Sequence, residues 1–250
     1  MASFSGISPQ ELSEQAELER FLKAAEISEI SKGAMGGRSD SWRVELKLNT
    51  TFKKGVFKFI DRARPLRLAQ SYKYELAAYE LSKLLGIDII PPVVPKTVDK
   101  QKGSLQIFME NCITEDKRRP KKLEPPNPKA FNNALEEINV FENLTYCPRE
   151  DLGDILIHLN TWRVYRVDFM EAFDPLPELL PDVELSRCSI RLYKSLQNVS
   201  PKSINLTLSP YLNAAEIASL LERRALILKR LDSLINDKGR DAVLFGPAQK

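Results

Sequence analysis

The pattern of apolar residues changes its period midway along the chain, and this change limits the folds that the sequence can adopt. In the first half, residues such as Val44 and Leu46 alternate with polar neighbours, which is the period of a half-buried strand. Beyond residue 128, apolar residues such as Phe131, Ile138 and Phe141 recur at helical spacing. Strands and helices are therefore largely segregated, which predicts an α+β fold with a β-rich amino half and a helical carboxy half.

Local signals predict where the main elements begin and end. Four helix starts are expected, at the capping box of residues 8–11, at Ser71, at Asn127 and at Asn213. The second helix is expected to stop at Gly86, and the fourth near residue 239. The expected strands cover residues 42–48, 56–60, 93–98 and 104–110, with a turn over residues 49–55.

A charged, proline-rich segment separates the two halves. Residues 113–128 include the run TEDKRRPKKLEPPNP, which favours a hinge or linker. We therefore expect an N-terminal helix and β-rich lobe over residues 1–112 and a mainly helical lobe over residues 129–250. The basic run KRRPKK is interpreted as a solvated loop, with docking to an acidic partner or to membrane phosphate as the alternative.

Composition argues against several classes of function. The 37 basic and 34 acidic residues give a net charge of +3, too even a balance for a protein that mainly coats nucleic acid. Three widely spaced cysteines and one histidine provide no structural zinc motif. The N-terminus has no signal-peptide pattern, and no run approaches the roughly 18 apolar residues of a membrane span. We therefore expect a cytoplasmic protein without a membrane span or a specific nucleic-acid partner.

Lys58 is a charged residue on an expected strand whose two faces are both apolar. Val56 and Ile60 share its face, and Phe57 and Phe59 form the other. A lysine in such a strand needs an anionic partner or a route to water. Two interpretations follow: an edge-strand lysine whose ammonium group reaches solvent, or a lysine held to bind phosphate oxygens.

Glu75 lies early in the helix that follows this strand. Ala78 and Ser82 lie on the same stripe of the helix, and such small neighbours allow the helix to approach a sheet closely. A surface glutamate is the simpler interpretation, because glutamate is mostly exposed in folded proteins. The alternative is a carboxylate that orients the ammonium group of Lys58.

A predicted hairpin further along the chain brings two carboxylates together. The segments DILIHL and WRVYRVD flank residues 160–161, which predicts a two-residue turn. With residues 159 and 162 opposed, Asp154 falls opposite Val167, and Asp168 follows directly. Opposed or diagonal residues in such a ladder lie about 5–8 Å apart. The two aspartates are therefore either solvated hairpin ends or ligands of a shared magnesium or manganese ion.

Further motifs occur in a definite order around these residues: KGAMGG at 32–37, VFKFID at 56–61, YELAAYELSKLLGIDIIPP at 74–92, GSLQIFME at 103–110, YCPREDLGDILI at 146–157 and RVDFMEAF at 166–173. In this order they resemble the protein-kinase-like superfamily. Within this superfamily, the sequence resembles atypical branches: the phosphatidylinositol 3-/4-kinase and HipA-like groups and bacterial relatives of the secretory-pathway kinases. The resemblance implies a two-lobed fold with ATP and magnesium or manganese as cofactors. It also implies a protein or small-molecule acceptor, whose identity the sequence does not indicate.

The resemblance implies roles for particular residues in the amino half. It assigns the glycine-rich phosphate loop to Gly33, Gly36 and Gly37, the ATP-binding lysine to Lys58, and the lysine's partner to Glu75, with Glu80 as the fallback. Met109 and Glu110 correspond to the strand end and hinge, and would lie near adenine.

In the carboxy half, the resemblance implies two metal ligands. Asp168 matches the aspartate of the Asp-Phe-Gly motif, although methionine replaces the glycine, and Asp154 matches the metal-binding asparagine. The catalytic loop departs from the family pattern, because Arg149 occupies the place of the base-like aspartate. Glu150 and Asp151 are adjacent and are the candidate substitutes.

Two functions follow from this departure. In kinase chemistry the lysine and the metal position the phosphates, whereas the base mainly orients the acceptor. The first function is an ATP- and magnesium-dependent phosphotransferase with an unknown acceptor. The alternative is a pseudokinase that serves as a nucleotide-binding or interaction module. A transferase of another kind on the same scaffold is a third interpretation.

Overall fold

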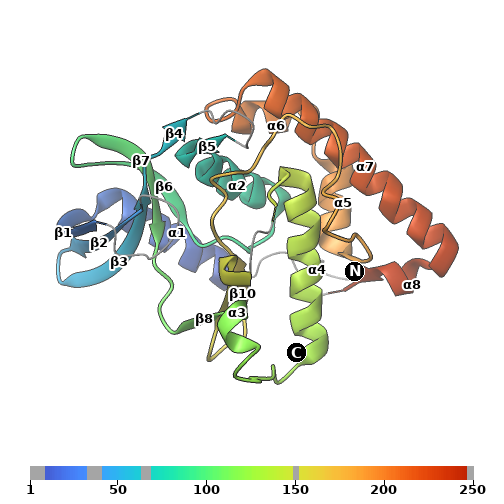
Figure 1. Cartoon of the computed structure of the whole chain (residues 1–250), viewed down its shortest axis with the longest axis horizontal. Helices are drawn as coiled ribbons and strands as arrows, with labels where there is room; N and C mark the ends of the chain where they lie inside the picture. Colours follow the sequence, from blue (N-terminus) through green and yellow to red (C-terminus); the bar gives the residue numbers. More distant parts are fainter. Residues whose placement is uncertain (1–8, 33–40, 63–68, 149–151, 247–250) are drawn as a thin grey trace.

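The computed structural model describes residues 9–32, 41–62, 69–148 and 152–246, and it confirms the α+β fold (Figure 1). A five-stranded antiparallel sheet forms the amino half, with the strand order β1-β2-β3-β7-β6. Its strands are β1 (Glu26–Lys32), β2 (Trp42–Leu48), β3 (Thr51–Lys58), β6 (Val93–Val98) and β7 (Gln101–Ile107). Helices α1 (Pro9–Ala24) and α2 (Tyr72–Leu85) pack against this sheet.

Two strands are longer at their start than the sequence pattern predicts. The expected turn over residues 49–55 is too long, because β3 already begins at Thr51 and pairs with β2 from there. Similarly, β7 begins at Gln101 rather than at residue 104, and it ends at Ile107. The added residues, 51–55 and 101–103, do not alternate between apolar and polar, so the sequence pattern does not mark them. The connecting turns have only two residues each, which suits the positive φ of 55° at Asn49.

The predicted hairpin of the carboxy half has the expected register. Strands β9 (Ile155–His158) and β10 (Val164–Arg166) pair antiparallel, and the backbone N–H of Val167 donates to the carbonyl of Asp154 at 2.9 Å. The loop is longer than expected, because the last paired residues are His158 and Arg163. Strand β8 (Cys112–Thr114) adds a third strand beside β9.

The segment over residues 113–128 contains regular structure. Besides β8, it contains the short helix α3 (Glu115–Arg118). The basic run is exposed at five of its six residues, but Arg118 is 9% exposed and pairs with the buried Glu115, Nε to Oε2 at 2.6 Å. The interpretation of the whole run as a solvated loop is therefore wrong for Arg118.

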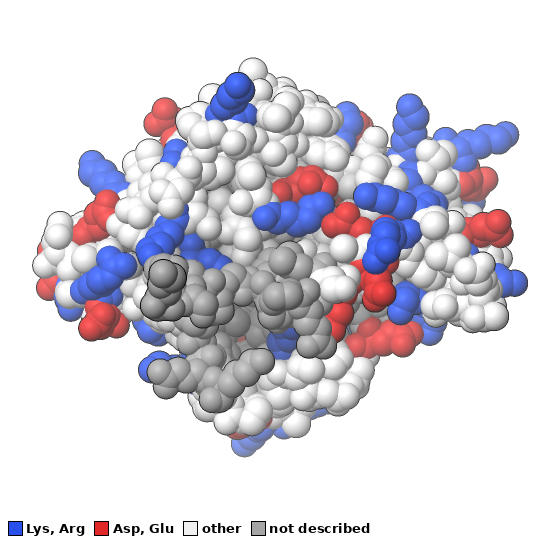
Figure 2. All heavy atoms as spheres, turned by 180° about the vertical axis from the view of Figure 1, so that it is seen from behind, with Lys and Arg blue, Asp and Glu red and all other residues white. Residues whose placement is uncertain are grey.

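Helices dominate the rest of the carboxy half (Figure 1). They are α4 (Pro128–Thr145), α5 (Ile190–Asn198), α6 (Pro201–Leu208), α7 (Ala214–Lys238) and α8 (Arg240–Val243). The short remaining elements are β4 (Asp61–Arg62), β5 (Gln70–Ser71), the 3₁₀ helix η1 (Leu152–Asp154), β11 (Cys188–Ser189) and β12 (Leu244–Phe245). None of the described helices combines the length and apolar character that crossing a membrane requires. Over the face shown in Figure 2, lysine and arginine side chains lie interspersed with aspartate and glutamate.

Two apolar cores hold the molecule together, and α2 belongs to the larger one. The smaller core joins α1 to the five-stranded sheet through residues such as Leu22, Leu46 and Phe57. The larger core contains Leu81 and other residues of α2 together with apolar residues of α4, α5, α6 and α7. Since α2 also packs on β6 and β7, it connects the sheet to the helical half.

Candidate functional site

A cleft of about 480 Å³ lies between the five-stranded sheet and the β8–β10 sheet. Val56 and Lys58 of β3 line one side, and Asp154 and Asp168 line the other. The end of β7 and the residues after it, 106–109, close a third side. The cleft therefore brings together Lys58, Asp154 and Asp168, which sequence analysis assigned to nucleotide and metal binding.

Lys58 is enclosed at the centre of the sheet. Strand β3 lies between β2 and β7, and Lys58 is 8% exposed, so the interpretation as an edge-strand lysine is wrong. Its Nζ lies 2.6 Å from Oε1 of Glu75 and 2.9 Å from Oδ1 of Asp168. Three elements that are distant in the sequence, β3, α2 and the segment after β10, thus meet at one ammonium group.

Glu75 is buried, at 2% exposed, so the interpretation as a surface glutamate is also wrong. The side chain of Ser71 caps α2 and accepts a hydrogen bond from the backbone N–H of Lys73, which places Glu75 in the first turn. Its Oε1 accepts hydrogen bonds from Lys58 and from the backbone N–H of Phe169 at 3.1 Å. The fallback Glu80 instead pairs with Lys83 on the same helix, at 3.0 Å.

The electrostatics of this triad favour a charged lysine. Burial opposes the charged form of Lys58, but Asp168 and Glu75 raise the pKa of its ammonium group above the usual value. Burial would raise the pKa of Asp168, yet Lys58 and then Arg166 hold it below the usual value. Burial raises the pKa of Glu75, and the neighbouring Lys58 opposes that rise. Lys58 is therefore a permanent positive charge beside the cleft.

Asp154 and Asp168 have the chemistry and the position to hold a divalent cation. Their side chains are 27% and 41% exposed and both line the cleft. Magnesium is usually held by one or two carboxylates together with substrate phosphates, so these two aspartates fit its coordination. No cluster of three or more metal-ligating side chains occurs within the described ranges, so phosphate oxygens and water would complete the coordination.

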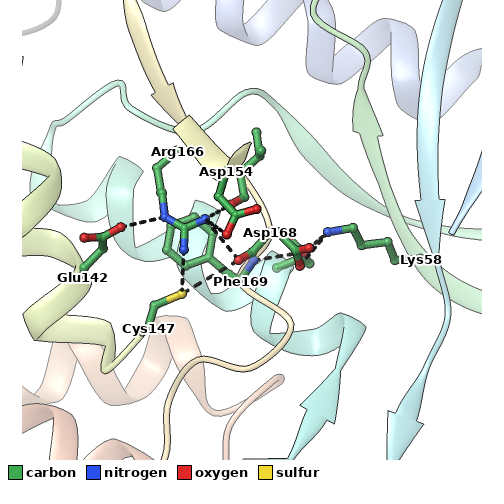
Figure 3. Close-up of polar contacts among 9 residues, drawn as sticks. Lys58, Glu142, Cys147, Asp154, Arg166, Asp168 and Phe169 are labelled. Atoms are coloured by element: carbon green, nitrogen blue, oxygen red, sulfur yellow. Dashed lines mark hydrogen bonds and ion pairs between the residues drawn. The ribbon is translucent and has the colours of Figure 1, made fainter. Parts of the chain in front are cut away.

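Arg166 is a residue of this site that sequence analysis missed. It is fully buried, and its Nε donates to Oε1 of Glu142 at 2.7 Å (Figure 3). Its Nη1 lies 3.4 Å from Oδ2 of Asp154 and 3.3 Å from the carbonyl oxygen of Asp168. The available signal was its position on a strand two residues before Asp168, because alternate residues share a face.

The two residues assigned to the hinge lie in different surroundings. Met109 lines the cleft. The side chain of Glu110 is 70% exposed and its Oε1 lies 3.7 Å from Nζ of Lys54, beside a separate pocket of about 240 Å³. Sequence analysis did not single out Gln106, which is 8% exposed and lines the cleft beside Met109. A role of these residues near a base stays a prediction.

The remaining assigned residues lie outside the described residues. These are Gly33, Gly36 and Gly37 of the glycine-rich segment, and Arg149, Glu150 and Asp151 of the catalytic loop. Ser41, which directly precedes β2, lines the cleft. The roles of the glycines and of the three catalytic-loop residues stay predictions.

Comparisons with known proteins bear on the fold. A structure of hydra Fam20 with sugar matches with a TM-score of 0.71 and 14% identity, over 100% of this chain and 97% of that chain. The Helicobacter pylori proinflammatory kinase CtkA matches with a TM-score of 0.52 and 11% identity, over 84% of this chain and 95% of that chain. No protein-family model and no curated protein matches the sequence. The chain therefore has a kinase-like α+β fold, with an antiparallel amino-terminal sheet and a helical carboxy half, as the order of its motifs predicts.

Proposed function

We propose that the chain binds ATP with a divalent cation and is a kinase-like phosphotransferase with an unknown acceptor. The arrangement of Lys58 carries this proposal. A buried lysine with two carboxylate partners opens onto a cleft that also contains a second aspartate, Asp154. The kinase-like fold agrees with the proposal, since it is shared with the kinase CtkA.

The two partners of Lys58 differ in a way that suits phosphate binding. Glu75 is almost completely buried, so it fixes the direction of the ammonium group. The side chain of Asp168 is 41% exposed and therefore has a surface left for a further ligand. Lys58 would bind phosphate oxygens as a point charge, and Asp154 and Asp168 would hold the cation. When bound, the cation would neutralise charge on the phosphates during transfer.

The test is the thermal stability of the purified protein with ATP and magnesium, manganese or no metal. A ligand that binds only the folded state adds about 2.7 kcal/mol to the free energy of unfolding at a hundredfold excess over its dissociation constant. We expect a metal-dependent rise in Tm that Lys58→Ala and Asp168→Ala abolish. Lys54→Ala is the matched control, because Lys54 lies on the same strand but pairs with the exposed Glu110. Absence of any shift with every metal would contradict the proposal.

The second candidate is a pseudokinase, and Arg149 in the place of the expected base supports it. Measurement of ADP release from ATP, with and without candidate acceptors, separates the two functions. For an active enzyme, Glu150→Gln or Asp151→Asn is expected to lower turnover by about 10²–10⁴-fold and to leave the ATP-dependent Tm shift intact. A wild-type protein that shows the Tm shift and no turnover would favour the pseudokinase.

A further inference from the structure

We propose that Arg166 is the positioning residue of the cation site, and that it fixes Asp154 and Asp168 in one geometry that favours magnesium. The inference deepens the proposed function and rests on it. It concerns a side chain that contacts both aspartates but is not among the residues that line the cleft. Figure 3 shows its guanidinium group among Glu142, Cys147 and Asp154, with Asp168 and Lys58 beyond.

The first argument is that the guanidinium group is enclosed and bonded on all its nitrogens. Nε donates to Glu142 on α4, and Nη2 donates to Sγ of Cys147 at 3.5 Å. Nη1 donates to the carbonyl oxygens of Val167 and Asp168 and pairs with Asp154. Because the planar fork of arginine has a fixed geometry, partners held by it are fixed relative to one another.

The second argument concerns the backbone of Asp168. Its φ is 65°, in the left-handed region that few residues other than glycine adopt. Its carbonyl oxygen accepts from Nη1 of Arg166 at 3.3 Å and from Sγ of Cys147 at 3.8 Å. Arg166 therefore holds the carboxylate of one aspartate and the backbone of the other. A change at this one residue would disturb both cation ligands together.

The third argument is the arrangement of charge. Asp154 pairs with Arg166, and Asp168 pairs with Lys58, so each aspartate has its own cationic partner. This pairing offsets the repulsion between the two carboxylates, and Arg166 is itself held by the fully buried Glu142. Magnesium requires near-ideal octahedral geometry, whereas calcium accepts flexible ligands at longer distances. Aspartates in fixed positions therefore favour magnesium over calcium.

The test measures how much magnesium, and how much calcium, produces half of the ATP-dependent rise in Tm. Removal of Arg166 alone would take the cationic partner from the buried carboxylate of Glu142, so the test variant is the double substitution Glu142→Gln with Arg166→Met. Loss of such an outer partner of a metal ligand typically lowers metal affinity by about 10–100-fold. We expect the half-saturating magnesium concentration to rise by about that factor, and the calcium value to change much less.

Two controls separate positioning from a purely structural role. Cys147→Ala removes a contact of Arg166 and a contact of the Asp168 carbonyl oxygen, but it leaves the pair of Arg166 and Asp154 in place, so we expect a smaller rise in the half-saturating magnesium concentration than with the double substitution. In an Asp154→Asn background, we expect the double substitution to change the half-saturating magnesium concentration less, because Asp154→Asn already alters the contact between residues 154 and 166. The inference would be overturned if the double variant had a lower Tm but the same ratio of half-saturating magnesium to calcium concentrations as the wild type. If the wild type shows no metal-dependent shift, the proposed function itself fails.

Discussion

Glu75 is the residue whose role follows most directly from its contacts. It is buried between the ammonium group of Lys58 and the backbone of Phe169, so its charge has no access to solvent. We expect Glu75→Gln to weaken ATP binding, because Lys58 then keeps only the exposed partner Asp168. The lost charged hydrogen bond is expected to lower the free energy of unfolding by about 1–3 kcal/mol.

Isothermal titration of ATP with magnesium and chemical denaturation measure the two effects. Glu80→Gln is the matched control, because Glu80 lies on the same helix and pairs with Lys83 rather than with Lys58. Equal ATP affinity in both variants and the wild type would show that the buried carboxylate does not orient Lys58.

For single residues, the sequence predicts which face of a strand or helix is buried better than it predicts which side chains contact one another. The apolar neighbours of Lys58 indicate that it is enclosed, since strand alternation is a local property. Sequence analysis did not single out Arg166, because its partners Glu142 and Cys147 are 24 and 19 residues away in the sequence. A local sequence pattern does not indicate contacts between residues that far apart. Glu110 illustrates the converse, since the chain turns at this residue after β7 has ended at Ile107, and its side chain pairs with Lys54 outside the cleft.

At the scale of elements, helix α1 holds helix α2 in place. Oε1 of Glu19 on α1 accepts from the hydroxyl group of Tyr79 at 2.7 Å and from Nζ of Lys83 at 3.1 Å, and both donors lie on α2. Tyr79 is fully buried and lies one turn after Glu75. From the sheet, Nζ of Lys96 donates to the last carbonyl groups of α1, including those of Leu22 and Lys23. The position of Glu75 therefore depends on α1.

We expect Glu19→Gln to lower Tm at neutral pH and to weaken ATP binding. Burial would raise the pKa of Glu19, but the hydrogen bond from Tyr79 and the charge of Lys83 hold it below its ordinary value of 4.5. A lowered folded-state pKa gives stability that is present above pH 4.5 and lost as the pH falls through the folded value. The Tm difference between wild type and variant is therefore expected to shrink on acidification.

Melting curves of both proteins from neutral to acidic pH measure this difference. The control is Glu17→Gln, a change at an exposed residue of the same helix. A Tm difference that is constant over the whole pH range would contradict the role of the Glu19 carboxylate.

The sequence predicts elements well where a cap or an alternating face marks them. The start of α7 carries the capping box of Asn213 and Glu216, and Gly86 ends α2 in the left-handed conformation, as expected. The hairpin register is confirmed, and it was predicted from the position of the turn at residues 160–161. Helices α5 and α6 were not predicted, since their apolar residues contact distant parts of the larger core and form only short local patterns.

At the scale of the whole molecule, the two tryptophans report on different cores. Trp42 belongs to the smaller core, and Trp162 packs against the larger one. Variants Trp42→Phe and Trp162→Phe therefore leave one probe each. We expect both to show the same denaturation midpoint, because α2 is part of the larger core and also packs on the sheet. Two separate midpoints would mean that the sheet and the helical half unfold independently.

The membership of α2 in the larger core has a consequence for any ligand of the cleft. Helix α2, which carries Glu75, belongs to the larger core, whereas Lys58 lies on the sheet, and the 2.6 Å contact between the two side chains joins these parts of the molecule. We therefore expect a ligand that contacts Lys58 and the two aspartates to fix the orientation of the sheet relative to the helical half. A fluorophore on the sheet and another on α7 would thus work as a sensor of occupancy, even before the natural acceptor has been identified.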